Sequence, residues 1–96
     1  MKVAVLKESK EKECRVSLTP DVVESLTKQG FDCLVEKDAG LLSYFTDEKY
    51  ENAGAQILSD SKQIYANADV VLKVNAPSAE EISYMKKGAV LISLMH

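Results

Sequence analysis

The chain has 96 residues, of which 46% are hydrophobic and 28% are charged. This length suffices for one small domain that buries about 60–65% of the surface of its unfolded chain, and a second domain does not fit. Twelve basic and fifteen acidic residues give a net charge of −3 with interspersed signs, which argues against a basic surface for nucleic acid. One histidine and two cysteines without a Cys-x-x-Cys spacing are too few ligands for a zinc site.

The apolar runs of the chain are short. The longest, such as Ala89 to Met95, fall far below the roughly 20 residues that span a bilayer. The apolar run 3–6 follows the first residues directly, without the charged segment and cleavage site of a secretory signal. We therefore expect a cytoplasmic domain in which Cys14 and Cys33 are reduced thiols, with Cys33 in the core.

Five apolar runs rich in β-branched residues predict the strands of one sheet. Each run is short enough for a strand that is buried on both faces. Helical stretches lie between the runs, and parallel strands need such crossovers, so the pattern predicts an α/β fold with an open, doubly wound parallel sheet. The predicted strands cover residues 3–6, 33–35, 55–58, 70–74 and 90–94.

The first predicted helix has clear signals at both ends. Thr19 before Pro20 predicts an N-cap followed by proline at the first helical position. Gly30 is expected to end the helix in a left-handed conformation, as the residue of a Schellman motif. The side chains predicted to face the sheet are Val22, Val23 and Leu26.

Three further helices are predicted, over 47–53, over 62–67 and from Ser78 onwards. The last has the clearest start signal, because Ser78 and Glu81 form a capping box in which each side chain satisfies a backbone N–H group. We expect this helix to end at Gly88, just before the fifth strand.

The carboxyl ends of parallel strands meet at one edge of a sheet, where ligands bind in open α/β folds. At this edge the sequence places Arg15 after the first strand, Lys73 at the end of the fourth and His96 after the fifth, with Lys7, Glu8 and Asn75 nearby. Arginine can clamp a carboxylate, lysine can polarise a carbonyl and histidine can shuttle a proton. The group suits a small carboxylate or a phosphate-bearing ligand, and a solvated or ion-paired surface role is the alternative for each residue.

Nothing in the sequence predicts a dinucleotide site. The four glycines are isolated, and no Gly-x-Gly-x-x-Gly fingerprint is present. A nucleotide site of the intact protein is therefore expected mostly downstream. The sequence stops at His96, directly after an apolar strand and without a helix to cover it, so we expect a chain truncated at its C-terminus.

Segments that carry a family resemblance run through nearly the whole chain. They are Lys-Glu at 7–8, Glu-Cys-Arg-Val-Ser-Leu-Thr-Pro at 13–20, Gly-Phe at 30–31, Val-Glu-Lys-Asp-Ala-Gly at 35–40, Tyr50 with Ala-Gly-Ala at 53–55, and Leu-Lys-Val-Asn-Ala-Pro at 72–77. As a set they resemble the N-terminal domain shared by alanine dehydrogenases and the alpha subunit of proton-translocating NAD(P) transhydrogenase.

The resemblance implies that residues 1–96 are part of an N-terminal domain with a flavodoxin-like or Rossmann-like sheet. Family members continue with a separate Rossmann domain that binds NAD(H), and they are typically homodimers. In alanine dehydrogenases, residues matching Arg15 and Lys73 hold the pyruvate carboxylate, and a histidine matching His96 is the catalytic acid/base group. In the transhydrogenase branch Arg15 and Lys73 also occur, while the position of His96 varies.

The segments at 43–45, 73–77 and 90–94 resemble the transhydrogenase alpha subunit more closely. That branch implies hydride transfer between NAD(H) and NADP(H) coupled to proton translocation, with NADP(H) on a membrane-embedded beta subunit. The alpha subunit would then be cytoplasmic and peripheral to the inner membrane, and this fragment alone is expected to bind no cofactor and to be inactive. Alanine dehydrogenase, with NAD-dependent reductive amination of pyruvate, stays open as an alternative, as does a non-enzymatic flavodoxin-like binding module.

Overall fold

The computed structural model describes residues 1–8 and 16–93. These residues form a five-stranded sheet in the order β3-β2-β1-β4-β5, in which all neighbouring strands are parallel. The open parallel sheet and its five strands are thus confirmed. The strands are β1 (Lys2–Val5), β2 (Asp32–Glu36), β3 (Gln56–Leu58), β4 (Val70–Lys73) and β5 (Val90–Ser93).

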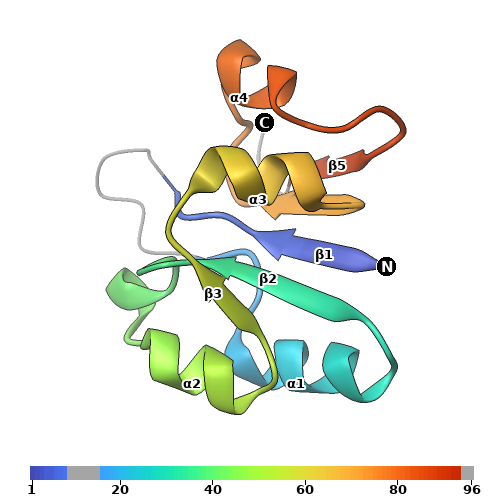
Figure 1. The fold of residues 1–96 in the computed structure, drawn as a ribbon. Helices are drawn as coiled ribbons and strands as arrows, with labels where there is room; N and C mark the ends of the chain where they lie inside the picture. Colours follow the sequence, from blue (N-terminus) through green and yellow to red (C-terminus); the bar gives the residue numbers. More distant parts are fainter. Residues whose placement is uncertain (9–15, 94–96) are drawn as a thin grey trace.

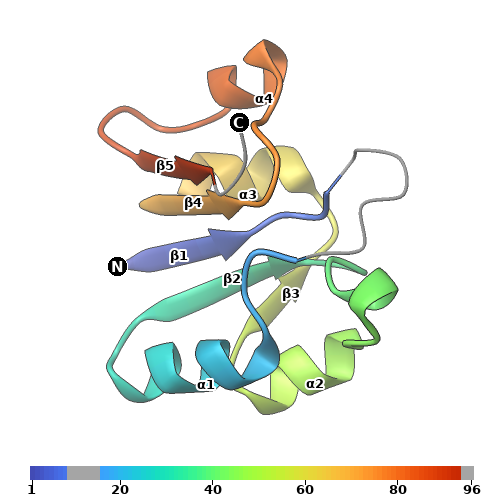
Figure 2. The same cartoon turned by 180° about the vertical axis from the view of Figure 1, so that it is seen from behind.

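Helices cover both faces of this sheet. In Figure 1 and Figure 2, α1 (Pro20–Lys28) and α2 (Asp47–Asn52) lie on one side of it. On the other side lie α3 (Ser61–Asn67) and α4 (Ala79–Ser83). A short 3-10 helix, η1 (Leu41–Ser43), precedes α2 and was not predicted. No helix within the described ranges is long and apolar enough to cross a membrane.

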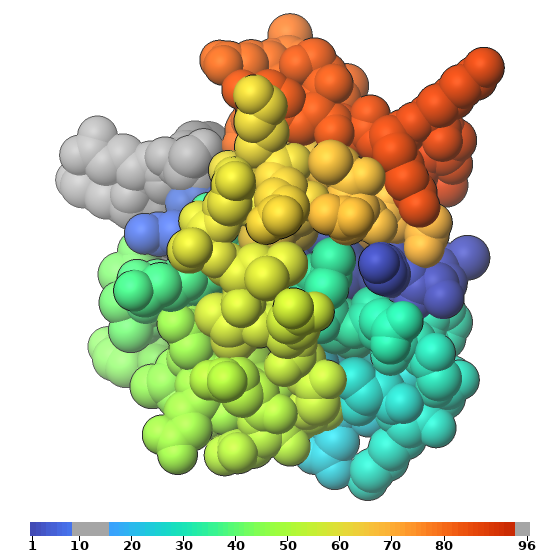
Figure 3. All heavy atoms as spheres, viewed as in Figure 1, coloured from blue at the N-terminus to red at the C-terminus, as the bar shows by residue number. Residues whose placement is uncertain are grey.

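The central strand β1 joins the two halves of the core. Val5 packs with Val23 and Tyr50 on the face of α1 and α2, while Ala4 packs with Ile64 on the face of α3. Neighbouring strands cover both edges of β1, and in Figure 3 the blue atoms of residues 1–8 are visible only where this segment begins and where it ends. Cys33 is buried in the first half of the core, as predicted, and burial raises the pKa of its thiol.

The C-terminal end of α1 confirms the predicted Schellman motif. The N–H of Gly30 donates to the carbonyl of Thr27, and the N–H of Phe31 donates to the carbonyl of Leu26, each at 3.1 Å. Gly30 has a φ of 96°, which a residue with a side chain adopts only under strain. The chain thus reverses at this glycine and enters β2.

The apolar stripe of α1 is narrower than predicted. Val23 is fully buried and Leu26 packs beside it, but 44% of Val22 is exposed. Adjacent helical residues do not share a face, so only one of the two valines can point at the sheet. Thr19 occupies the predicted N-cap position, although its side chain makes no capping hydrogen bond.

The last helix is shorter than predicted, because α4 ends at Ser83 and does not continue to Gly88. The capping box at its start is formed as predicted. Beyond Ser83 the chain leaves the helical path, so that Tyr84 packs against the core on the α3 face and Lys86 pairs with Asp69 at 2.5 Å. These contacts with distant residues replace the last helical turn.

One face of β4 and β5 is less well covered than the rest of the sheet. Leu91 packs against the core on the α3 face, and α3 lies behind both strands in Figure 2. Val90 and Ile92 alternate with Leu91 and point to the other face, where they are 53% and 44% exposed. An apolar strip is therefore open to solvent at the edge of the described sheet.

Tyr50 connects α2 to the segment that precedes α1. Its side chain is fully buried, and its hydroxyl donates a hydrogen bond to the carbonyl of Leu18 at 2.8 Å. Burial, together with the nearby charge of Asp47, raises the pKa of Tyr50 from 10.0 to about 12. The neutral phenol is thus the form that the folded chain holds.

We expect Tyr50→Phe to lower the free energy of unfolding by about 1 kcal/mol at neutral pH, because the carbonyl of Leu18 loses its donor. The pKa of Tyr50 is higher in the folded chain than in the unfolded chain, so its contribution is complete below pH 10 and is lost as the pH rises towards about 12. Urea unfolding between neutral and alkaline pH checks both effects. A variant that loses stability as steeply as the wild type above pH 10 would contradict this assignment.

Candidate functional site

The candidate site lies where the carboxyl ends of β1 and β4 meet. These two strands pair in parallel, with Val5 opposite Leu72. The strands β2 and β3 lie on one side of β1, whereas β4 and β5 lie on the other side. Such a topological switch point creates the crevice in which open α/β sheets bind their ligands.

Glu8 fills this crevice with its own carboxylate. One carboxylate oxygen accepts a hydrogen bond from the N–H of Val74 at 2.9 Å, and the other accepts one from the N–H of Asn75 at 3.0 Å. The carboxylate also lies 3.7 Å from the Nζ of Lys73, and only 2% of each of the two side chains is exposed. Two amides and an ammonium group therefore compensate a buried negative charge.

Lys73 ends β4 and is almost completely enclosed. Its exposed fraction is 1%, and a lysine is rarely buried to this extent without a partner of opposite charge. It alternates with Leu72 and shares the face of Val71, which packs in the core beside α3. The predicted candidate cation is thus at the expected edge, in an ion pair with Glu8 that the sequence did not predict.

A pocket of about 390 Å³ opens beside this pair. The sequence predicted a cationic cluster at this edge, but the described part of the edge is mainly acidic, with three glutamates and one lysine in the pocket wall. Glu36 is the last residue of β2, and this position at the carboxyl end of a strand is a sequence signal for this edge. Glu81 was assigned only to the capping box. The residues that line the pocket are Lys7, Glu8, Glu36, Ser61 and Glu81.

The carboxylates of this wall have partners of their own. Glu36 accepts a hydrogen bond from the N–H of Lys7 at 2.8 Å, and burial raises its pKa against the opposing effects of Lys7 and Lys73. Glu81 accepts a hydrogen bond from the hydroxyl of Tyr65 at 3.4 Å. Burial and the charge of Glu81 raise the pKa of Tyr65, which stays a neutral donor.

The described residues do not fit the phosphates of a dinucleotide. The amides of Val74 and Asn75 at the switch point already bind Glu8, and the pocket beside them is lined by three carboxylates that would repel a phosphate. In the ranges 1–8 and 16–93, no cluster of His, Cys, Asp and Glu side chains could hold a metal ion. What the arrangement can do is hold and orient the side chain of Lys73 through its pairing with Glu8.

The other predicted site residues have different outcomes. Lys7, Glu8 and Asn75 come together with Lys73 at the predicted edge. Arg15, His96 and Cys14 lie outside the described residues.

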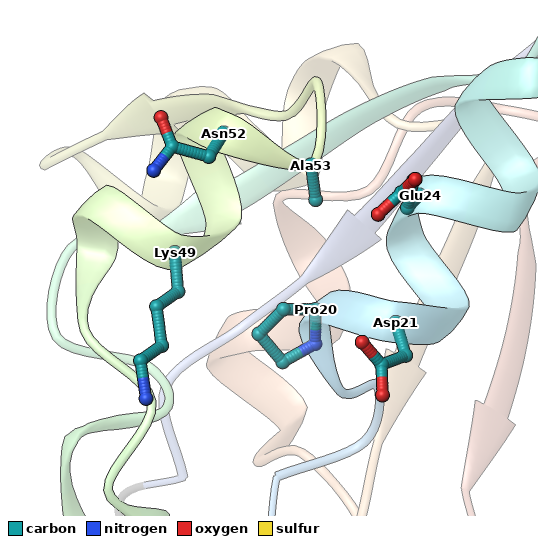
Figure 4. A pocket seen from close by; sticks show the side chains of 6 residues that line it. All are labelled: Pro20, Asp21, Glu24, Lys49, Asn52 and Ala53. Carbon is teal, nitrogen blue, oxygen red and sulfur yellow. The ribbon is translucent and has the colours of Figure 1, made fainter.

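A second pocket, of about 240 Å³, lies between α1 and α2. Figure 4 shows Asp21 and Glu24 on α1 across from Lys49 on α2. All three side chains are exposed, and none belongs to the candidate site. This pocket is a solvated groove between two surface helices.

In a comparison with known proteins, residues 4–96 match the family described as alanine dehydrogenase/PNT, N-terminal domain. The alanine dehydrogenase of Bacillus subtilis is 47% identical over 96 residues, which are 100% of this chain and 25% of that protein. The NAD(P) transhydrogenase subunit alpha of Haemophilus influenzae is 44% identical over 95 residues, which are 99% of this chain and 18% of that protein. The chain thus spans a quarter or less of the length of these two relatives.

Two solved structures share the fold. The transhydrogenase from Sinorhizobium meliloti has a TM-score of 0.91 and 43% identity, covering 99% of this chain and 28% of that one. An L-alanine dehydrogenase has a TM-score of 0.92 and 34% identity, covering 100% of this chain and 26% of that one. The fold alone therefore does not distinguish the two kinds of relative, both of which are oxidoreductases.

Proposed function

Because the chain belongs to the family of the alanine dehydrogenase/PNT N-terminal domain, we propose that it is the leading part of the first domain of a proton-translocating NAD(P) transhydrogenase alpha subunit. The observation that carries this choice is the identity of 43% to the solved transhydrogenase, against 34% to the solved alanine dehydrogenase at nearly the same TM-score. The closer resemblance of segments 43–45, 73–77 and 90–94 to the transhydrogenase branch supports it.

In this proposal the whole protein transfers a hydride between NAD(H) and NADP(H) and couples the transfer to proton translocation. A separate Rossmann domain holds NAD(H), and a membrane-embedded beta subunit holds NADP(H). The alpha subunit lies in the cytoplasm and reaches the membrane through that partner. The carboxylate of Glu8 occupies the position at which this type of sheet usually binds a phosphate. This supports the proposal that a separate domain binds the cofactor.

Within the proposed enzyme, Lys73 and Arg15 bind the substrate at the carboxyl edge of the sheet. Lys73 has three N–H donors, so its pairing with Glu8 leaves capacity for an acceptor atom of the substrate. Arg15 would add a planar fork that can grip a carboxylate or phosphate with two hydrogen bonds. The nicotinamide carries the hydride when bound, and this chain contributes binding and orientation.

The test is NADPH-dependent reduction of an NAD analogue by the full-length protein, purified with and without its membrane partner. Hydride transfer is expected only when the partner is present, because NADP(H) is bound there. No transfer in the complete complex, or equal transfer by the alpha subunit alone, would refute the proposal.

Alanine dehydrogenase is the second candidate function. The identity of 47% to the Bacillus subtilis enzyme favours it, as does the presence of Arg15, Lys73 and His96 in one chain. It predicts NADH-dependent reductive amination of pyruvate, with Arg15 and Lys73 on the carboxylate and His96 as the acid/base group.

We also propose that the chain self-associates as a homodimer or larger assembly through the edge of β5. β5 is the edge strand of the sheet that the described residues form, and Val90 and Ile92 expose apolar surface on it. Light scattering at tens of micromolar is expected to give at least the mass of a dimer, and Ile92→Lys is expected to reduce it. A monomeric mass for the wild type would contradict this prediction.

A further inference from the structure

We propose that Glu8 is the positioning residue of the candidate site, and that it holds Lys73 and the turn after β4 in the orientation in which the ammonium meets a hydrogen-bond acceptor of the substrate. The proposal rests on the proposed function in taking Lys73 as a substrate-binding group. Glu8 acts through Lys73 and the backbone, because its own carboxylate is enclosed and fully engaged.

The carboxylate of Glu8 makes three contacts that restrict the positions of Lys73, Val74 and Asn75. It accepts the N–H of Val74 and the N–H of Asn75, at 2.9 and 3.0 Å, and it pairs with the Nζ of Lys73 at 3.7 Å. Glu8 follows β1 and its partners stand at the end of β4, so these contacts tie the carboxyl ends of two neighbouring strands together. A lysine side chain is flexible, and an enclosed counter-charge restricts where its ammonium can lie.

This arrangement does more than balance the charge of Lys73. A simple ion pair would leave the amides of Val74 and Asn75 to other acceptors, whereas one carboxylate here fixes the backbone of both residues. The turn that follows leads into α4, and Glu81 of that helix lines the same pocket as Glu8. A displaced Glu8 would therefore move the ammonium, the turn and the pocket wall together.

The first test follows the backbone amide signals of Val74 and Asn75 in this chain by ¹H–¹⁵N NMR. Glu8→Ala removes the carboxylate and leaves space for acetate, so added acetate is expected to bind saturably and to return both signals towards their wild-type positions. Glu8→Gln fills the same space and is expected to show shifted signals without an acetate response. Glu24→Gln removes only an exposed pair with Lys28 and serves as the matched control, with both signals unchanged.

The second test measures hydride transfer by the full-length protein with its membrane partner. Glu8→Gln keeps the size of the side chain and is expected to lower kcat/KM on the order of 100-fold while the protein stays folded, because the ammonium is misplaced. Acetate is expected to restore activity to Glu8→Ala but not to Glu8→Gln. A folded Glu8→Gln enzyme with a lower melting temperature but unchanged kcat and KM has lost only a structural contact, and that result would overturn the proposal.

Failure of the proposed function gives a different result. If the wild-type complex transfers no hydride, the transhydrogenase assignment is wrong, and the NMR experiment decides the role of Glu8. Saturable acetate binding that restores the signals of Val74 and Asn75 in Glu8→Ala then supports positioning by the carboxylate. If Glu8→Ala does not fold, unshifted signals of these two amides in Glu8→Gln overturn it.

Discussion

Lys73→Met is expected to lower the free energy of unfolding by about 3–5 kcal/mol, because it removes one partner of a buried ion pair and leaves the other without compensation. Methionine has a similar length and fills most of the same space, so the loss reports the charge more than the packing. The remaining Glu8 carboxylate, 2% exposed, would keep its two amide donors but lose its counter-charge. Urea denaturation followed by circular dichroism measures the loss.

A double variant tests whether the side chains of Glu8 and Lys73 are energetically coupled. Glu8→Gln combined with Lys73→Met buries no charge at this point, so it is expected to recover part of the stability that Lys73→Met loses. The interaction free energy from the cycle is expected to be about 1–3 kcal/mol. Losses that simply add would show that the two side chains are not coupled.

Gly40→Ala is expected to lower the free energy of unfolding by about 1–3 kcal/mol through overpacking. A Cβ atom at this position would lie 2.8 Å from the ring and hydroxyl of Tyr50 and 2.9 Å from the Cβ of Phe45. Tyr50 cannot easily give way, because it is fully buried and hydrogen-bonded to the carbonyl of Leu18. The φ of Gly40 is −101°, which alanine adopts readily, so the cost is one of space.

Gly30→Ala is the matched control for this prediction. Nothing lies within 4 Å of a Cβ atom at Gly30, but its φ is 96°, so the substitution costs about 1 kcal/mol through the backbone alone. Adding Tyr50→Phe removes one of the clashing atoms and is expected to relieve Gly40→Ala but not Gly30→Ala. Thermal and urea unfolding of the wild type, the three single variants and the two double variants check this, and a Gly40→Ala variant as stable as the wild type would refute it.

Much of the fold was predictable because its signals are local. The five apolar runs, the capping box at Ser78 and the glycine after α1 each act within a few residues, and the structure has all of them. The end of α4 was not predictable, because contacts of Tyr84 and Lys86 with residues far away in the sequence decide it. Gly40 has a negative φ, and its need for glycine depends on the position of Tyr50.

The candidate site was predictable only in part, for a similar reason. Parallel strands with helical crossovers bring their carboxyl ends to one edge, which was enough to place Lys73, Glu8 and Asn75 together. The pairing of Glu8 with Lys73 depends on β1 and β4 being direct neighbours, and the element pattern alone does not determine the strand order. The acidic wall likewise depends on Glu36 of β2 and Glu81 of α4 lining the same pocket as Glu8.

Hydride transfer by the full-length protein with its membrane partner is the most direct test that this chain is part of a transhydrogenase alpha subunit. NADPH-dependent reduction of an NAD analogue and NADH-dependent reductive amination of pyruvate are measured in parallel, for the wild type and for His96→Gln. We expect hydride transfer without pyruvate turnover, and the same rate in His96→Gln. Pyruvate turnover that His96→Gln abolishes would contradict the transhydrogenase assignment and make Arg15, Lys73 and His96 the catalytic set.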